Sequence, residues 1–185
     1  MHPLPFDIFP VLTGDRLRLR HLQPGDAPRL SILRSDAAVN RYLGRPEKTS
    51  EPEAEAFIRK ISDSIAKGQS LYWVIELNDT PGLIGTICLW NLAPEKDQAE
   101  LGYEMMPAYQ GRGLMQEAVK LLLDFCFGPF ALQTVIALPL PENAPSVRLL
   151  ERNRFTLDKN AVLELEPGEP EPAFFSLTQQ TWHGI

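Results

Sequence analysis

AELGYEMMPAYQGRGLMQEAVKLLLDFCF, residues 99–127, joins a strand pattern, a glycine-containing turn and a helix pattern without a break. Apolar and polar residues alternate from Ala99 to Met106, which favours a strand that Pro107 would end. Apolar residues at helical spacing then predict a helix over Gly113–Phe127, with Gly128-Pro129 as its stop signal. The chain therefore passes from a strand through a tight turn directly into a helix.

The turn has the chemistry of an anion site. The first amides of a helix have no acceptor within the helix, and the helix dipole adds partial positive charge there. Gly111 and Gly113 let the backbone approach a ligand, and Arg112 adds a positive charge. No acidic residue occurs between Pro107 and Gln116. We expect this turn to bind a phosphate group. It is neither a GxxxxGK[ST] P-loop nor a complete GxGxxG dinucleotide motif.

The composition is that of one domain over residues 1–185, with 44% apolar and 23% charged residues. The formal net charge of −6 argues against general binding to nucleic acid or to acidic membranes. We expect neither a signal peptide nor a membrane span. Cys88 and Cys126 lie in apolar segments without metal-ligand spacing, so two free thiols in the cytoplasm and no metal site are expected.

The remaining patterns predict strands and helices on both sides of this segment. The prediction is an α/β (α+β) fold, in which helices cover a mixed sheet. Residues 161–166 and 173–180 would form a closing antiparallel pair, with a proline-rich loop over 166–172 between them. The other expected strands are 15–22, 71–77, 83–90 and 134–140, and the other expected helices are 23–35, 50–68 and 144–153.

The central segment resembles the acetyl-CoA signature of the GNAT acetyltransferases. That signature reads Gln/Arg-x-x-Gly-x-Gly/Ala, and Gln110, Gly113 and Met115 stand at its fixed places. Met115 departs from the small residue that is usual at the last position. The variant QGxGxM resembles the branch that contains the ribosomal-protein N-terminal acetyltransferases.

A second segment, ENAPSVRLLERNRF, is similar to a later motif of the same branch. Asn143, Ser146 and Phe155 match that motif, whereas Arg154 replaces its glycine. The resemblance extends over nearly the whole chain. It implies a mostly antiparallel sheet of about seven strands with helices on both faces. It also implies that acetyl-CoA lies between two splayed parallel strands, here 99–106 and 134–140.

The resemblance further implies where the donor and the catalytic groups lie. The pyrophosphate would sit on the amides of residues 111–115, and the pantetheine arm would pair with backbone at Met105 and Met106. The donor-binding residues implied in this way are Met105, Met106, Gln110, Gly111, Arg112, Gly113, Leu114, Met115, Asn143 and Ser146.

Glu100 is the first candidate for the base that takes the proton of the attacking amine, and Glu104 is the second. Strand parity puts both on one face if no bulge intervenes, although either could be a solvated strand residue. Ser146 is the candidate acid or partner of the CoA sulfur, because Leu150 stands where many relatives carry a tyrosine. Asn143 is equally well placed as a helix N-cap.

Two functions of different classes follow. The first is an acetyl-CoA-dependent N-acetyltransferase that acts on a primary amine, either a protein N-terminus or a small amine, with Trp90 and Asn91 lining the acceptor pocket or packing in the sheet. The alternative is a non-catalytic acyl-CoA sensor or interaction domain that has kept only the phosphate cradle. The sequence does not distinguish a monomer from a homodimer.

Overall fold

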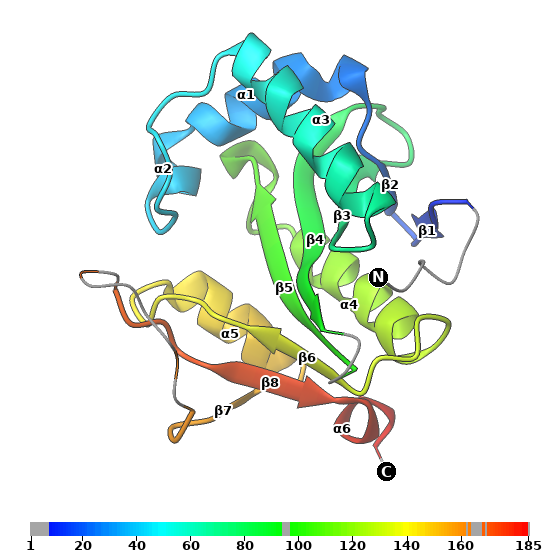
Figure 1. Ribbon diagram of the computed structural model, residues 1–185, viewed down its shortest axis with the longest axis vertical. Coiled ribbons are helices and arrows are strands. Elements are labelled where there is room, and N and C mark those ends of the chain that lie inside the picture. Colours follow the sequence, from blue (N-terminus) through cyan, green and yellow to red (C-terminus); the bar gives the residue numbers. More distant parts are fainter. Residues whose placement is uncertain (1–7, 94–96, 162, 164–167, 169, 185) are drawn as a thin grey trace.

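The computed structural model describes residues 8–93, 97–161, 163, 168 and 170–184, and their strands form one sheet in the order β1-β2-β3-β4-β5-β6-β8-β7 (Figure 1). The strands are β1 (Leu12–Thr13), β2 (Leu17–His21), β3 (Leu71–Leu77), β4 (Leu83–Ala93), β5 (Gln98–Met105), β6 (Thr134–Ala137), β7 (Thr156–Leu157) and β8 (Phe175–Thr178). The helices are α1 (Ala27–Ser35), α2 (Ala37–Asn40), α3 (Glu51–Ala66), α4 (Leu114–Phe127), α5 (Ala144–Arg152) and α6 (Gln179–His183), with short 3-10 turns η1 (Pro24–Asp26) and η3 (Pro107–Tyr109).

Strands β5 and β6 form the one parallel pair of this sheet as described, and the other neighbours are antiparallel. The parallel pairing is short, since it joins Gln98–Glu100 to Thr134–Ile136. Beyond Glu100 the two strands diverge, as Figure 1 shows. The predicted mixed sheet with a splayed parallel pair is therefore confirmed.

Helices cover both faces of the sheet. Helices α1 and α3 pack on one face, where Tyr72, Val74 and Cys88 belong to a buried apolar cluster. Helix α4 packs on the opposite face against a larger cluster that contains Trp73 and Leu101. Side chains alternate between the two faces along each strand, so neighbouring residues of β3 such as Tyr72 and Trp73 belong to different apolar clusters. The opening where β5 and β6 diverge therefore faces two sides with different side chains.

Local signals explain where α3 begins and ends. Ser50 is the N-cap, and the side chain of Glu53 accepts from both the amide and the hydroxyl of Ser50 at 2.6 Å. Gly68 follows the last turn with a φ of 67°, a left-handed conformation that glycine adopts readily. The helix expected over residues 50–68 is thus confirmed to within two residues.

Three expected strand boundaries need correction or fall outside the description. Strand β6 ends at Ala137, because Pro139 cannot donate to a strand ladder. Gln179 and Gln180 begin helix α6 instead of extending β8, because Thr178 caps that helix by accepting from the amide of Thr181. Residues 161–166 and the loop 166–172 lie largely outside the described residues, and β8 instead lies between β6 and β7.

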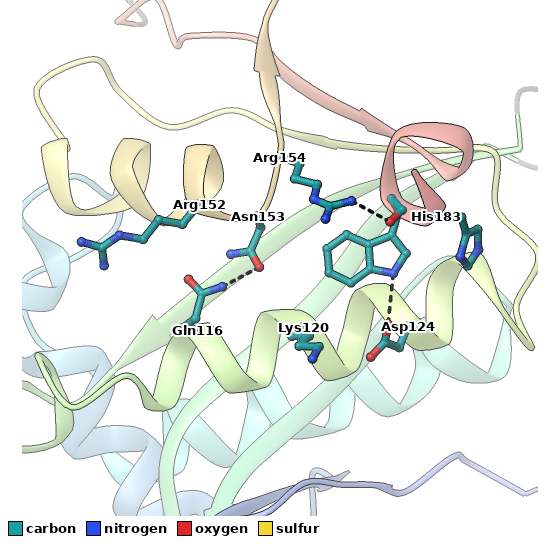
Figure 2. Close-up of a pocket in the computed structure, with 8 residues that line it drawn as sticks. Gln116, Lys120, Asp124, Arg152, Asn153, Arg154 and His183 are labelled. Atoms are coloured by element: carbon teal, nitrogen blue, oxygen red, sulfur yellow. Dashed lines mark hydrogen bonds between the residues drawn. The ribbon is translucent and has the colours of Figure 1, made fainter. Parts of the chain in front are cut away.

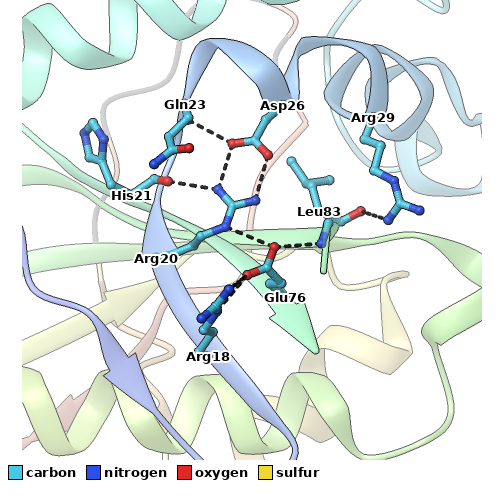
Figure 3. A network of polar contacts seen from close by, with 9 residues as sticks. Arg18, Arg20, His21, Gln23, Asp26, Arg29, Glu76 and Leu83 are labelled. Carbon is cyan, nitrogen blue, oxygen red and sulfur yellow. Dashed lines mark hydrogen bonds and ion pairs between the residues drawn. The ribbon is translucent and has the colours of Figure 1, made fainter. Parts of the chain in front are cut away.

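Glu76 on β3 is the centre of a buried polar network (Figure 3). It pairs with Arg18 at 2.7 Å and with Arg20 at 3.2 Å, and it accepts from the amide of Gly82 at 2.6 Å. Arg20 also binds Asp26. Burial alone would raise the pKa of Glu76, but the Gly82 amide and the two arginines outweigh it and hold the pKa below its ordinary value.

Replacing Glu76 with glutamine is expected to lower the free energy of unfolding at pH 7 by about 2 kcal/mol, since hydrogen bonds to a charged group are lost. Because the pKa of Glu76 is lower in the folded protein, its carboxylate stabilises the fold at pH values above about 4.3, the ordinary pKa of a glutamate. This stabilisation is lost as the pH falls through the lower pKa of the folded state. Urea unfolding at pH 7 and at pH 3 measures both effects. Glu55→Gln, in an exposed ion pair with Arg59, should change stability by less than about 0.5 kcal/mol. Equal stability of wild type and Glu76→Gln at pH 7 would contradict this account.

Candidate active site

The glycine turn between β5 and α4 adopts the conformation that an anion cradle requires. Gly111 and Gly113 have φ angles of 73° and 74°, which are left-handed values that favour glycine. Gly113 is the N-cap of α4. A Cβ added at Gly111 would have no heavy atom within 4 Å, so this part of the turn is open. Among the described residues, no group accepts from the amides of residues 111 to 115.

Arg16, just before β2, holds this turn from behind. Its guanidinium donates to the carbonyl of Arg112 at 2.9 Å and to that of Gly113 at 3.1 Å. The carbonyl and the following amide of a trans peptide point in opposite directions, so the amides of Gly113 and Leu114 face away from Arg16. Glu117 fixes Arg16 through its two carboxylate oxygens at 2.9 and 2.7 Å. These contacts join residues that are 96 and 97 positions apart, and no local sequence pattern predicts them.

Gln110 connects the turn to the end of β5. Its side-chain amide donates to the carbonyl of Met105 at 2.8 Å. The amide of Met106 donates to Ile84 at 2.9 Å. Gln110 and Met105, two residues that the resemblance implies for donor binding, are therefore in contact, and in this structure the Gln110 side chain holds the strand end.

Glu100 and Glu104 lie on the same face of β5, the face that α1 and α3 cover. Across β4, Glu100 pairs with Trp90 and Glu104 pairs with Thr86, with no register shift between them. The parity expected from the sequence is therefore observed. Gly102 stands between the two carboxylates, and a Cβ there would lie 3.0 Å from the indole nitrogen of Trp90. Glycine at this position gives the indole room beside the strand.

The two carboxylates differ in their partners. Glu100 is half-buried and accepts from the side-chain amide of Asn91 at 2.8 Å. Its other oxygen has no hydrogen-bond partner among the described residues. Glu104 is more deeply enclosed and forms an ion pair with Arg45 at 2.7 Å. Arg34 lies near this pair, and burial together with the charge of Arg45 lowers the pKa of Arg34. A proton taken up by Glu104 would therefore weaken its bond to Arg45, whereas Glu100 has a carboxylate oxygen available.

Ser146 lies on the opposite face, in the first turn of α5. Its hydroxyl is 2.6 Å from the hydroxyl of Tyr103 on β5. Asn143 accepts from the amide of Ser146 at 3.3 Å, which is the N-cap contact expected of it. Leu150, at the position where the resemblance leads one to expect a tyrosine, is fully buried in the core. Tyr103 is not among the residues predicted from the sequence. Strand alternation could have placed it on the face opposite to Glu100 and Glu104, because it directly precedes Glu104.

Arg154 occupies the glycine position of the second motif, and it adopts a left-handed φ of 67° there. Its guanidinium donates to the carbonyls of Thr181 and Trp182 at 3.3 and 3.1 Å, which ties it to α6. The left-handed conformation is unusual for a residue other than glycine. At Arg154 it occurs together with the two hydrogen bonds from its side chain to α6.

A polar pocket of about 460 Å³ lies between α4, α5 and α6 (Figure 2). It begins at Gln116, immediately after the cradle, and Lys120 and Arg152 bring positive charge to it. Asp124 is engaged by the indole of Trp182 at 3.0 Å. The sequence did not reveal this pocket, because its walls come from three separate segments. The lining residues are Gln116, Lys120, Asp124, Arg152, Asn153, Arg154, Trp182 and His183.

Both cysteines are free and buried, as the sequence predicts. Burial raises the pKa of both thiols, so Cys88 and Cys126 are poor nucleophiles. Within the described ranges, no cluster of three or more His, Cys, Asp or Glu side chains could hold a metal ion. No helix among the same residues is long and apolar enough to cross a membrane.

Comparison with known proteins identifies the family. The profile of the acetyltransferase (GNAT) domain matches residues 16–156. The chain is 32% identical over 148 residues to the Bacillus subtilis (strain 168) protein named "Uncharacterized N-acetyltransferase YoaA", covering 80% of this chain and 84% of that protein. A candidate ribosomal-protein-serine acetyltransferase from Vibrio cholerae has a similar structure, with a TM-score of 0.80, 27% identity and coverage of 96% and 99% of the two chains. Spermidine N-acetyltransferase from Vibrio cholerae, in complex with CoA and spermine, shares the fold with a TM-score of 0.75 at 22% identity, over 90% and 98% of the chains.

Proposed function

This chain belongs to the GNAT family of acetyltransferases, and on that premise we propose that it transfers the acetyl group of acetyl-CoA to a primary amine, with a protein N-terminal amine as the first acceptor to test. The observation that carries the proposal is the turn at residues 111–115. Its Gly113 and Leu114 amides face away from Arg16, and the turn follows the end of β5 beside the opening between β5 and β6.

The donor would occupy the cradle and the opening together. The pyrophosphate would sit on the amides of residues 111–115, of which those of Gly113 and Leu114 face away from Arg16, with Arg112 as an exposed cation. The pantetheine arm would follow the strand end at Met105 and Met106. The thioester would then lie near Asn143 and Ser146, where α5 begins.

The candidate groups lie on the two sides of this opening. Glu100, on the face of α1 and α3, would take the proton of the attacking amine through its available oxygen, and Glu104 is the second candidate. Ser146, on the face of α5, would donate a hydrogen bond to the sulfur as the C–S bond breaks. The amine thus attacks on one face while the thiol leaves on the other. No covalent intermediate with the enzyme is needed.

We propose an amine as the acceptor, without choosing between a protein and a small molecule. One structural relative is named for ribosomal-protein serine and another for spermidine, so proteins and small amines are both represented. The net charge of −6 favours a cationic acceptor, since the field of the protein attracts it. We propose a cytoplasmic location, where thiols stay reduced and acetyl-CoA is made, and no role for nucleic acid or membrane.

Release of CoA thiol in the presence of a panel of amines tests the function. The panel contains short peptides that begin with serine or alanine, spermidine and free amino acids. We expect thiol release that depends on one class of amine, with mass spectrometry locating the added acetyl group on the amine nitrogen. Tight binding of acetyl-CoA without thiol release over the whole panel would instead support the non-catalytic sensor.

Arg152 is expected to bind the 3′-phosphate of CoA, because it lines the pocket that begins next to the cradle. Arg152→Gln should weaken binding of CoA about fivefold, as expected for a partly exposed charged contact. Binding of 3′-dephospho-CoA should not change, which makes this ligand the matched control. Calorimetry with both ligands measures the difference. Equal weakening for both would place the 3′-phosphate elsewhere.

A further inference from the structure

Tyr103 and Ser146 make a hydroxyl pair across the opening between β5 and β6. The two oxygens are 2.6 Å apart. Tyr103 lies three residues beyond Glu100, the last residue of β5 that pairs with β6. Ser146 lies in the first turn of α5, the helix that follows β6. The bond therefore connects the two diverging segments at the place where the thioester is proposed to lie.

The chemistry of the two hydroxyls sets the direction of the hydrogen bond. A phenolic O–H is the more acidic of the two and is the better donor. Burial raises the pKa of Tyr103 to about 12, so it keeps its proton at neutral pH. When Tyr103 donates to Ser146 Oγ, the single hydrogen of Ser146 is free to point elsewhere. Leu150 has no donor to offer at this place.

We propose that Tyr103 is a positioning residue that fixes the hydroxyl of Ser146 as a hydrogen-bond donor to the sulfur of CoA. This inference rests on the proposed function, because it concerns the same donor site. In the transfer, the N–C bond forms and the C–S bond breaks, and the electron pair of the C–S bond goes to sulfur. The amine proton goes to Glu100. Ser146 stabilises the thiolate without ionising, and solvent supplies the proton that completes the thiol.

The inference makes a prediction that does not depend on turnover. A donor aimed at the sulfur stabilises the thiolate of bound CoA more than its thiol. The ratio of the affinity for CoA to that for desulfo-CoA, in which hydrogen replaces the thiol, should therefore increase as the thiol ionises. We expect this ratio to rise about tenfold from pH 7 to pH 9.5 in the wild type, since thiols ionise near pH 8.5. Dividing by the desulfo-CoA affinity cancels titration of the protein itself.

Tyr103→Phe and Ser146→Ala should each abolish this rise, and the double variant should behave like either single variant. Ser146→Thr keeps the hydroxyl and should keep the rise when Tyr103 is present. Calorimetry with CoA and desulfo-CoA at both pH values measures these ratios. A bond that only ties β5 to α5 would change thermal stability and the affinity for both ligands equally. A rise that persists in Tyr103→Phe would overturn the proposal.

Turnover provides a second readout once an acceptor is known. Tyr103→Phe should lower kcat about tenfold and leave KM for acetyl-CoA within about twofold, because the contact strengthens only as charge develops on sulfur. A wild-type protein that shows the pH-dependent ratio but releases no thiol would contradict the proposed function and leave the role of Tyr103 at the sulfur intact.

Discussion

Replacing Glu100 with glutamine is expected to lower kcat by about 10²–10⁴-fold, the usual contribution of a positioned base. Glutamine keeps the size of the side chain and can still accept from Asn91, but it cannot take up the amine proton. Affinity for acetyl-CoA should survive, because the cradle at residues 111–115 is unaltered. The loss should shrink as the pH approaches the pKa of the amine, near 8 for a protein N-terminus, since solvent then supplies neutral amine. Steady-state kinetics from pH 6.5 to 9 would measure both effects.

Glu104→Gln is the control on the same face of β5, and it should reduce kcat less. It would leave the enclosed charge of Arg45 without the opposite charge of Glu104, so it should also cost about 3 kcal/mol of stability. Its kinetics are meaningful only below its unfolding temperature. Normal turnover in Glu100→Gln together with an inactive, folded Glu104→Gln would identify the right face but the wrong residue. Full activity of both would mean that solvent deprotonates the amine.

Local patterns explain what the sequence predicted well. The strand, the glycine turn and helix α4 all lie within residues 99–127, so their periodicity and stop signals are read from neighbouring residues. The same is true of α3, whose capping box joins Ser50 to Glu53. The shared face of Glu100 and Glu104 was predictable because strand alternation continues without a register shift between them.

Contacts between distant segments explain what the sequence did not reveal. Arg16 is recognisable only as part of an alternating strand pattern, yet it orients the peptides of the cradle. Tyr103 meets Ser146 only because β5 and β6 diverge. The pocket beside the cradle requires α6, which arises where the sequence pattern favoured a longer strand. In each case the deciding information is the tertiary arrangement and not a local preference of the chain.

Gly113→Asp is expected to weaken binding of CoA by about 10–100-fold. The new carboxylate would lie at the N-terminus of α4, where it repels the phosphate groups and competes for the helix amides. The Cβ would also lie 3.5 Å from the guanidinium of Arg16, so the carboxylate would compete with the carbonyls that Arg16 now binds. Folding should survive, because aspartate is a good N-cap residue and tolerates the left-handed region better than most residues.

Gly113→Asn is the matched control, because asparagine has nearly the same shape, tolerates the same φ of 74° and carries no charge. The difference in CoA affinity between the two variants isolates the effect of charge from backbone strain. Raising the salt concentration should reduce that difference, since the site is open to solvent beside Gly111. Calorimetry on variants shown to be folded by circular dichroism measures the affinities. Equal affinity of the Asp and Asn variants would mean that the phosphates bind away from this turn, and the proposed donor site would have to be abandoned.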